Sequence, residues 1–181
     1  MTGYTGTTAV TNFPVLVRLS QKGVSGFFYG EMEYPETGAD LRFGIKTDTG
    51  IEPLDFDIDT WNTNGESLVW VRVPNLTNGF TFAAYYGFTN APAVRLSGTN
   101  VWRAYEGVWH LSSTNDASPQ ANHATDVGSH TKLTHPGVIG NCLTNASTTI
   151  QDANAHFVAP FSPARMTDNG KVCFSIWLNS D

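Results

Sequence analysis

The stretch PLDFDIDTW, residues 53–61, alternates between apolar and acidic side chains. The apolar members, which share one side of an extended chain, are Leu54, Phe56 and Ile58. The acidic members, which share the other side, are Asp55, Asp57 and Asp59. Successive side chains of a β-strand point to opposite faces, so this period of two indicates a strand with one buried and one wet face.

Similar apolar patterns recur along the first half of the chain. They predict strands at residues 13–20, 39–45, 67–73 and 80–88. Asn64-Gly65 lies between two of these segments and predicts a tight hairpin turn with positive φ at both positions. Pro74 is expected to end the strand over 67–73. Because no apolar repeat of helical period runs longer than three turns, we expect an all-β protein, with an antiparallel, jelly-roll-like β-sandwich first.

A Pro-, Gly- and Asn-containing connector at residues 89–107 predicts a second module after the first. We place the modules at residues 1–102 and 103–181 and expect Trp102 and Tyr105 to tie them together. Strands of the second module are expected at residues 107–111, 137–143, 148–152 and 171–178. Four strands are few for a sandwich core, so this second β-sandwich module is expected to be incomplete. The apolar strand at 171–178 would then lack partners and promote self-association.

The charge balance excludes some partners. The chain carries 10 basic and 16 acidic residues, a net charge of −6, without a cluster of Lys or Arg. Nucleic acids and anionic membranes need concentrated positive charge, so neither is expected as a partner. No apolar run reaches the roughly 20 residues that cross a bilayer. Two cysteines, Cys142 and Cys173, are either buried thiols or a disulfide.

Several sequence pieces carry a family likeness. They are NFPVLVRLS, GADLRF, PLDFDIDTWNTNGESLVWVRVPNL, YYGFTNA and VW, all within residues 12–102. This segment resembles DUF2341, a bacterial domain without an assigned activity. The resemblance implies a large secreted or envelope-associated protein, whose signal peptide would lie upstream of this chain. It also implies that a concanavalin A-like (laminin G-like) jelly roll follows, and EGVWHLSS, GVIGNCL and KVCFSIWLNSD look like its opening third.

The acidic row and one tryptophan are candidate ligand-binding residues. Asp55, Asp57 and Asp59 can bind a cation or sugar hydroxyls. Alternatively, they form a solvated face opposite Arg18, Arg42 or Arg72. Trp61 borders a polar turn and is either a stacking platform for a sugar or part of the core.

The polar stretch at residues 108–126 is the candidate metal site. Asp116, Asn122 and His123 supply oxygen and nitrogen groups, and Asp with Asn makes calcium the candidate ion. Turn formation by Asp, Asn and Pro119 explains the same composition without any ion.

Catalytic spacing is missing from the sequence. It contains neither Glu-x-Asp-x-x-Glu, nor Gly-x-Ser-x-Gly, nor His-Glu-x-x-His. We therefore expect a non-catalytic, extracellular accessory or adhesion module, with a glycan and the neighbouring domains as its candidate partners. The alternatives are a spacer that binds nothing, or an accessory part of a secreted glycoside hydrolase whose active site lies beyond residue 181.

Overall fold

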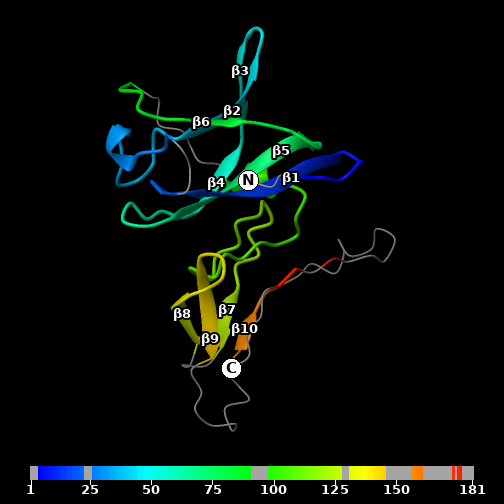
Figure 1. The fold of residues 1–181 in the computed structure, drawn as a ribbon. Coiled ribbons are helices and arrows are strands. Elements are labelled where there is room, and N and C mark those ends of the chain that lie inside the picture. The colour runs from blue at the N-terminus through cyan, green and yellow to red at the C-terminus, as the bar shows by residue number, and fades with distance from the viewer. Residues whose placement is uncertain are drawn as a thin grey trace. The chain divides into compact units, whose positions relative to one another are not determined.

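The computed structural model describes residues 4–22, 26–90, 98–127, 131–145, 156–160, 173 and 175–176. The chain divides into two compact units, Met1–Ala104 and Tyr105–Asp181. Figure 1 shows that strands are the main regular elements among the described residues. The protein is all-β with antiparallel pairing, as the alternation predicts. In the described residues, the only helical turns are η1 (Tyr29–Glu31) and α1 (Gly98–Val101), and no helix is long and apolar enough to span a membrane.

Within its described residues, unit 1 contains two three-stranded sheets. The first has the order β1 (Val10–Leu19), β5 (Ser67–Leu76), β4 (Phe56–Thr60). The second has the order β3 (Gly50–Leu54), β2 (Arg42–Thr47), β6 (Ala83–Tyr85). Both sheets contribute side chains to one hydrophobic cluster, so they share a single core.

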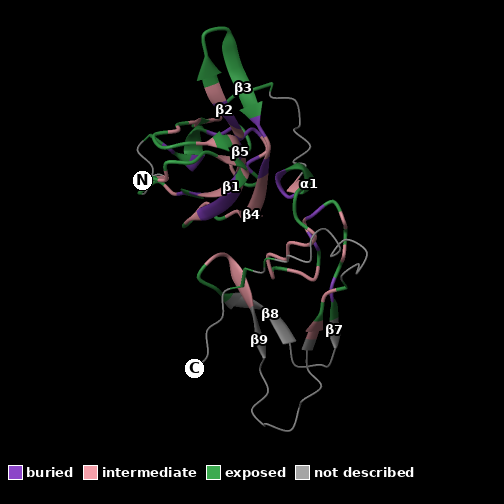
Figure 2. Ribbon diagram, turned by 90° about the vertical axis from the view of Figure 1, so that its right-hand side faces the viewer, coloured by how far each residue is buried: buried purple, intermediate pink, exposed green. Residues whose placement is uncertain are grey.

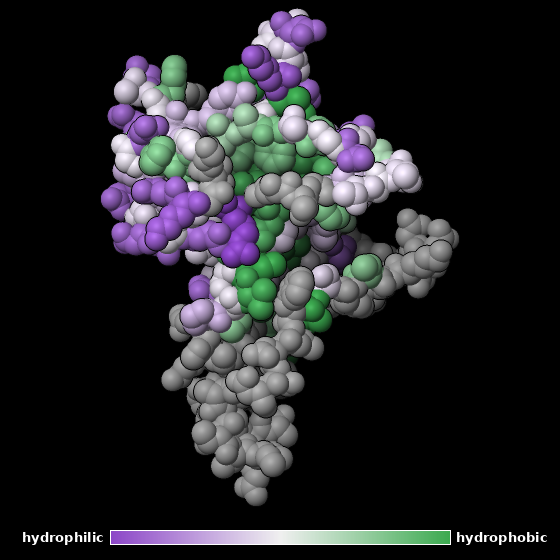
Figure 3. Space-filling model, viewed as in Figure 1, coloured by the Kyte–Doolittle hydropathy of each residue, from purple (hydrophilic) through white to green (hydrophobic). Residues whose placement is uncertain are grey.

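The core of unit 1 is built from the apolar face of each strand. Phe43 of β2 packs on Phe56 of β4 with a ring separation of 5.2 Å, and this contact joins the two sheets. The buried members contributed by the strands are Val17, Leu19, Phe43, Leu54, Phe56, Val69 and Val71. Each fully buried side chain of this size contributes about 1.5–3 kcal/mol. Figure 2 shows this burial within the sheets, whereas the β2–β3 hairpin projects beyond them with an exposed tip. Figure 3 shows that this tip is hydrophilic.

The segment predicted as one strand at 53–61 is two strands in different sheets. β3 ends at Leu54, which pairs with Phe43 of β2. β4 begins at Phe56, which pairs with Val71 of β5. Leu54 and Phe56 are both buried, so the alternation continues across the change of sheet and conceals it. The single-strand prediction was wrong because side-chain alternation does not specify a partner strand.

The hairpin between β4 and β5 is confirmed, but its predicted turn type is wrong. Neither Asn64 nor Gly65 has positive φ. Asn62 shapes the turn instead: its side-chain Oδ1 accepts from Asn64 N–H at 3.1 Å, and its backbone oxygen accepts from Gly65 N–H at 3.3 Å. The turn is therefore formed by the Asn62 side chain, which accepts from the backbone two residues later, and not by the predicted positive φ angles at Asn64 and Gly65.

Two strand limits also differ from prediction. β5 continues through Pro74 to Leu76, because Pro74 lies opposite Asn12, where the β1–β5 register has no paired residues. A proline in a strand is tolerated where no ladder hydrogen bond is needed. The predicted strand at 80–88 is a strand only over Ala83–Tyr85.

Unit 2 contains two pairs of short strands in its described residues. β7 (Thr125–Val127) pairs with β10 (His156–Val158), and β8 (Thr131–Pro136) pairs with β9 (Asn141–Asn145). The prediction of a strand at 107–111 was wrong, and residues 148–152 lie outside the described residues. From the strand predicted at 171–178, only Cys173, Ser175 and Ile176 are described, and they are exposed and outside any strand. Cys142 and Cys173 are free thiols, so the disulfide alternative was wrong, and Cys173 is not buried.

Candidate functional site

The three aspartates around β4 each accept a hydrogen bond from a side chain of the same unit. Asp55 forms an ion pair with Arg72 of β5. Asp57 accepts from Trp102 Nε1 at 2.8 Å, and Asp59 accepts from Trp70 Nε1 at 3.1 Å. Each aspartate of the acidic row therefore has a hydrogen-bond donor of its own. Of the three arginines predicted to lie opposite this row, Arg72 is the one that pairs with it.

The other two predicted arginines have different partners. Arg18 pairs with Glu66, with 2.6 Å between Nη2 and Oε2. Arg42 donates from Nη1 to the backbone oxygens of Ala39 and Leu41 at 2.9 and 2.7 Å. Burial lowers the pKa of the Arg42 guanidinium, and the charge of Asp40 opposes this shift. The sequence pattern did not distinguish these arginines because their partners lie outside the β4–β5 ladder.

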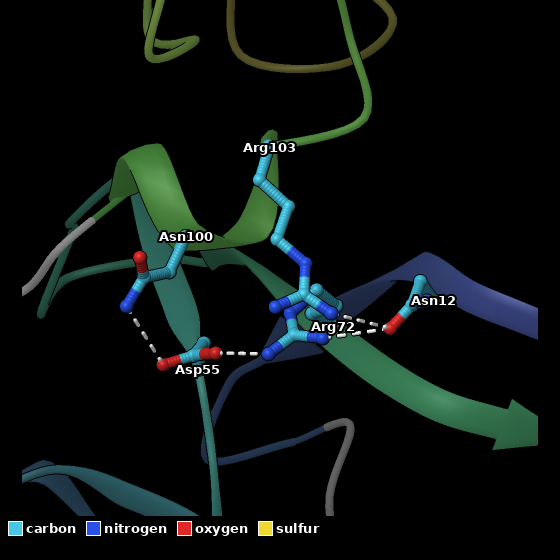
Figure 4. A network of polar contacts seen from close by, with 5 residues as sticks. All are labelled: Asn12, Asp55, Arg72, Asn100 and Arg103. Atoms are coloured by element: carbon cyan, nitrogen blue, oxygen red, sulfur yellow. Dashed lines mark hydrogen bonds and ion pairs between the residues drawn. The ribbon is translucent and has the colours of Figure 1, made fainter.

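The part of the connector over residues 98–103 packs on the outer face of the first sheet. α1 packs against β4 and β5, and the Trp102 ring meets the Trp70 ring edge-on at 5.4 Å. Figure 4 shows Asn100 donating to Asp55 at 3.3 Å, while Arg72 and Arg103 both donate to Asn12 Oδ1, at 2.7 and 3.2 Å. We call this set of eight residues the outer-face clamp: Asn12, Asp55, Asp57, Trp70, Arg72, Asn100, Trp102 and Arg103.

Close packing in the outer-face clamp depends on a glycine. A Cβ atom added to Gly98 would lie 2.6 Å from Asp57 Oδ1, so the carboxylate would have to shift. Gly98 therefore allows α1 to begin against the carboxylate of Asp57. These contacts place Trp102 in the packing of unit 1. Sequence analysis predicted a tie between the modules for Trp102 and did not find its partners, Asp57 and Trp70.

Trp61 is half-buried, and its indole N–H forms a hydrogen bond within the chain. Its Nε1 donates to the backbone oxygen of Pro35 at 2.7 Å, and its ring meets Tyr29 edge-on at 5.4 Å. Gly38 lies against the ring, since a Cβ added there would be 2.8 Å from it. The ring thereby holds the loop between β1 and β2 onto the core, instead of standing free as a platform.

Asp40 is a buried charged residue that sequence analysis missed. It is 1% exposed, and its carboxylate accepts from three backbone N–H groups, those of Glu33, Tyr34 and Gly87, at 3.1, 3.2 and 2.7 Å. Burial by itself raises the pKa of Asp40, but the backbone hydrogen bonds outweigh it, so the pKa lies below the usual range. The only sequence signal for Asp40 was an aspartate near the start of a predicted strand, in GADLRF. Alternation of apolar and polar residues does not show that such an aspartate is buried.

A second buried carboxylate organises the polar loop of unit 2. Asp116 Oδ1 accepts from the backbone N–H groups of Val108 and Ser118 at 2.7 and 2.8 Å. Asp116 Oδ2 accepts from Ser118 Oγ at 2.7 Å and from Asn122 N–H at 2.9 Å. The backbone N–H of Asp116 in turn donates to Nδ1 of His123 at 3.1 Å. The hydrogen bonds of this carboxylate thus connect Val108, at the start of the loop, with Ser118 and Asn122.

The other predicted calcium ligand is also engaged within the loop. Asn122 donates from Nδ2 to the backbone oxygen of Glu106 at 2.9 Å, and its backbone oxygen accepts from Trp109 Nε1 at 3.2 Å. A calcium site needs several oxygens directed at one point, but the Asp116 oxygens are directed at hydrogen-bond donors. Within the described residues, no group of three or more His, Cys, Asp or Glu side chains is arranged to hold a metal ion. Turn formation accounts for the geometry of Asp116 and Asn122.

The Asp116 carboxylate gives the loop a predictable response to pH. Burial raises its pKa, but the donors from Val108, Ser118 and Asn122 outweigh that effect, so the pKa lies below its ordinary value of 3.8. A carboxylate of this kind stabilises the fold fully above that value, and the stabilisation is lost as the pH falls through the folded pKa. We expect Asp116→Asn to cost about 2 kcal/mol at pH 7. Thermal unfolding of the full chain at several pH values measures it. The difference between variant and wild type should shrink below pH 3.8, and a constant difference would contradict this assignment.

A family comparison covers both buried carboxylates and most of the outer-face clamp. Residues 37–117 match the family model described as Domain of unknown function (DUF2341). The family predicted from the sequence is confirmed, but the match leaves out β1 and ends beyond residue 102. No curated protein and no solved structure matches the chain. The chain therefore contains a DUF2341 domain, a domain of unknown function, in residues 37–117.

Proposed function

We propose that the chain is a non-catalytic accessory module of a larger bacterial surface or secreted protein. One observation carries this proposal: the four aspartates that the sequence singled out, and the buried Asp40, all accept hydrogen bonds from donors of the same chain. They are Asp40, Asp55, Asp57, Asp59 and Asp116.

Hydrolytic chemistry would need some of these carboxylates for a substrate. Glycoside hydrolysis uses two carboxyl groups that face each other across the scissile bond. A general acid or base must also reach the proton that it transfers. Asp57 and Asp59 instead accept indole N–H groups, and Asp55 is paired with a guanidinium. These contacts support a structural use of the acidic row.

The location of the parent protein is part of the proposal. Only 14% of the residues are charged, and the surface polarity comes largely from Thr, Asn, Ser and Gly. The DUF2341 resemblance implies a secreted or envelope setting in bacteria. Within it, the module would order its neighbouring domains, and a glycan ligand is a second candidate function, favoured by exposed aromatic side chains beside Asp40.

Release of reducing ends from polysaccharides tests the absence of catalysis. The full chain is incubated with soluble β-glucan, xylan and galactomannan, beside a double variant, Asp55→Asn with Asp57→Asn. We expect neither protein to release reducing ends above the buffer blank, because both carboxylates serve the fold. Release by the wild type that disappears in the double variant would overturn the proposal.

A further inference from the structure

Two exposed aromatic side chains flank the buried Asp40 carboxylate. Tyr34 is 46% exposed and Phe88 is 67% exposed. The N–H of Tyr34 itself and the N–H of Gly87, the residue before Phe88, both donate to this carboxylate, at 3.2 and 2.7 Å. The loop that carries η1 and the chain after β6 consequently lie side by side (Figure 1).

The backbone under both rings is fixed. The carbonyl oxygen of Tyr34 accepts from the N–H groups of Thr37 and Gly38 at 3.3 and 2.8 Å. Gly87 has φ +79°, and a Cβ there would lie 2.7 Å from the backbone oxygen of Glu31, so only glycine fits. Rings held on a fixed backbone lose little freedom when they bind a ligand, which favours binding. Tyr34 and Phe88 lie on two segments that the Asp40 carboxylate joins, so their exposed rings offer a ligand apolar surface at one place.

The charged residues near Tyr34 and Phe88 indicate what charge a ligand of these rings can carry. Three exposed glutamates, Glu31, Glu33 and Glu36, lie in the same loop, and residues 26–41 contain no Lys or Arg. This surface repels a polyanion such as an acidic polysaccharide or a nucleic acid. Carboxylates also accept hydrogen bonds from hydroxyl groups, and the C–H face of a pyranose packs well on an aromatic ring.

We infer that Tyr34 and Phe88 form an aromatic platform for a neutral polysaccharide. The inference rests on the proposed accessory role and names a ligand class for it. Quaternary ammonium ligands are held by aromatic cages that surround the cation. Tyr34 and Phe88 are exposed side chains, and an exposed aromatic ring suits the C–H face of a pyranose in an extended chain. The neighbouring glutamates supply acceptors for its hydroxyls.

Native gel electrophoresis in polysaccharide-containing gels tests the aromatic platform. The full chain is run in gels with hydroxyethylcellulose or galactomannan, which are neutral, with alginate, which is anionic, and with chitosan, which is cationic. Tyr34→Ala, Phe88→Ala and their double variant are compared with Phe13→Ala, a control ring on β1 that is 43% exposed. We expect retardation in at least one neutral gel, weakened about fivefold in apparent Kd by each single variant. The double variant should migrate as in a blank gel, and Phe13→Ala should behave like the wild type.

Three results would overturn the aromatic platform. They are no retardation in either neutral gel, retardation that survives in the double variant, and retardation in chitosan alone that salt abolishes. The last result would show simple ion exchange by the glutamates. None of these results contradicts the proposed accessory role. That role is contradicted only if the wild-type chain releases reducing ends that the Asp55→Asn, Asp57→Asn double variant does not release. Both rings are exposed, so unchanged melting temperatures verify that each variant is folded.

Discussion

Replacing Trp102 with alanine is expected to lower the free energy of unfolding of unit 1 by about 3–5 kcal/mol. Trp102 is 4% exposed, its ring packs on Trp70, and its Nε1 binds Asp57. The variant therefore loses a buried aromatic side chain and leaves the Asp57 carboxylate without its indole donor. Urea unfolding of the full chain, followed by fluorescence, gives the midpoint and slope that are needed.

Two further variants separate the parts of this effect. Trp102→Phe keeps a ring against Trp70 but removes the N–H donor, so we expect a smaller loss of about 1–2 kcal/mol. Arg103→Ala removes an exposed side chain that donates to Asn12 from the same segment, and its effect should stay within about 0.5 kcal/mol. A Trp102→Ala loss below about 1 kcal/mol would show that the outer-face clamp does not belong to the stable part of unit 1.

Asp40→Ala is expected to cost about 3 kcal/mol at pH 7, because three backbone N–H groups lose their shared acceptor. Asp40→Asn keeps one oxygen acceptor and should cost less, about 1–2 kcal/mol. The control is Asp48→Ala in the exposed tip of the β2–β3 hairpin, which should change stability by less than about 0.5 kcal/mol. Chemical denaturation of the three variants of the full chain measures these differences.

The effect of Asp40→Ala should depend on pH with a definite sign. The folded-state pKa of Asp40 is lowered, so its stabilisation is complete above the ordinary value of 3.8 and is lost as the pH falls through the folded pKa. The wild type and Asp40→Ala should therefore become more alike in acid. If the variant were as stable as the wild type at pH 7, the carboxylate would not hold the η1 loop to the chain after β6.

Local patterns predicted β1, β2 and β5 because each of these strands buries several side chains in the core. Val17, Leu19 and Phe43 are buried where the alternation placed them, and all three belong to one core. The same patterns failed at Asp55, where the chain changes sheets. A period of two specifies which side of a strand is buried, but it does not specify the neighbouring strand.

The polar contacts of the candidate site could not be predicted, because their partners are distant in sequence. Asp40 and Gly87 are 47 positions apart, and Trp102 and Asp57 are 45 apart. Sequence analysis identified Asp55, Asp57, Asp59 and Asp116 as chemically interesting, but it could not tell an internal acceptor from a free one. That distinction depends on which donors the fold brings within hydrogen-bond distance.

The outer-face clamp has a mechanical consequence. The chain leaves unit 1 at Ala104, directly after Trp102 and Arg103 have been fastened to the sheet. Tension applied beyond Ala104 is therefore borne by Arg103 and Trp102 before it reaches β6. Once those contacts yield, the segment over residues 98–103 is released, and its length at full extension is about 20 Å. We therefore expect the outer-face clamp to open under load before the core of unit 1 unfolds.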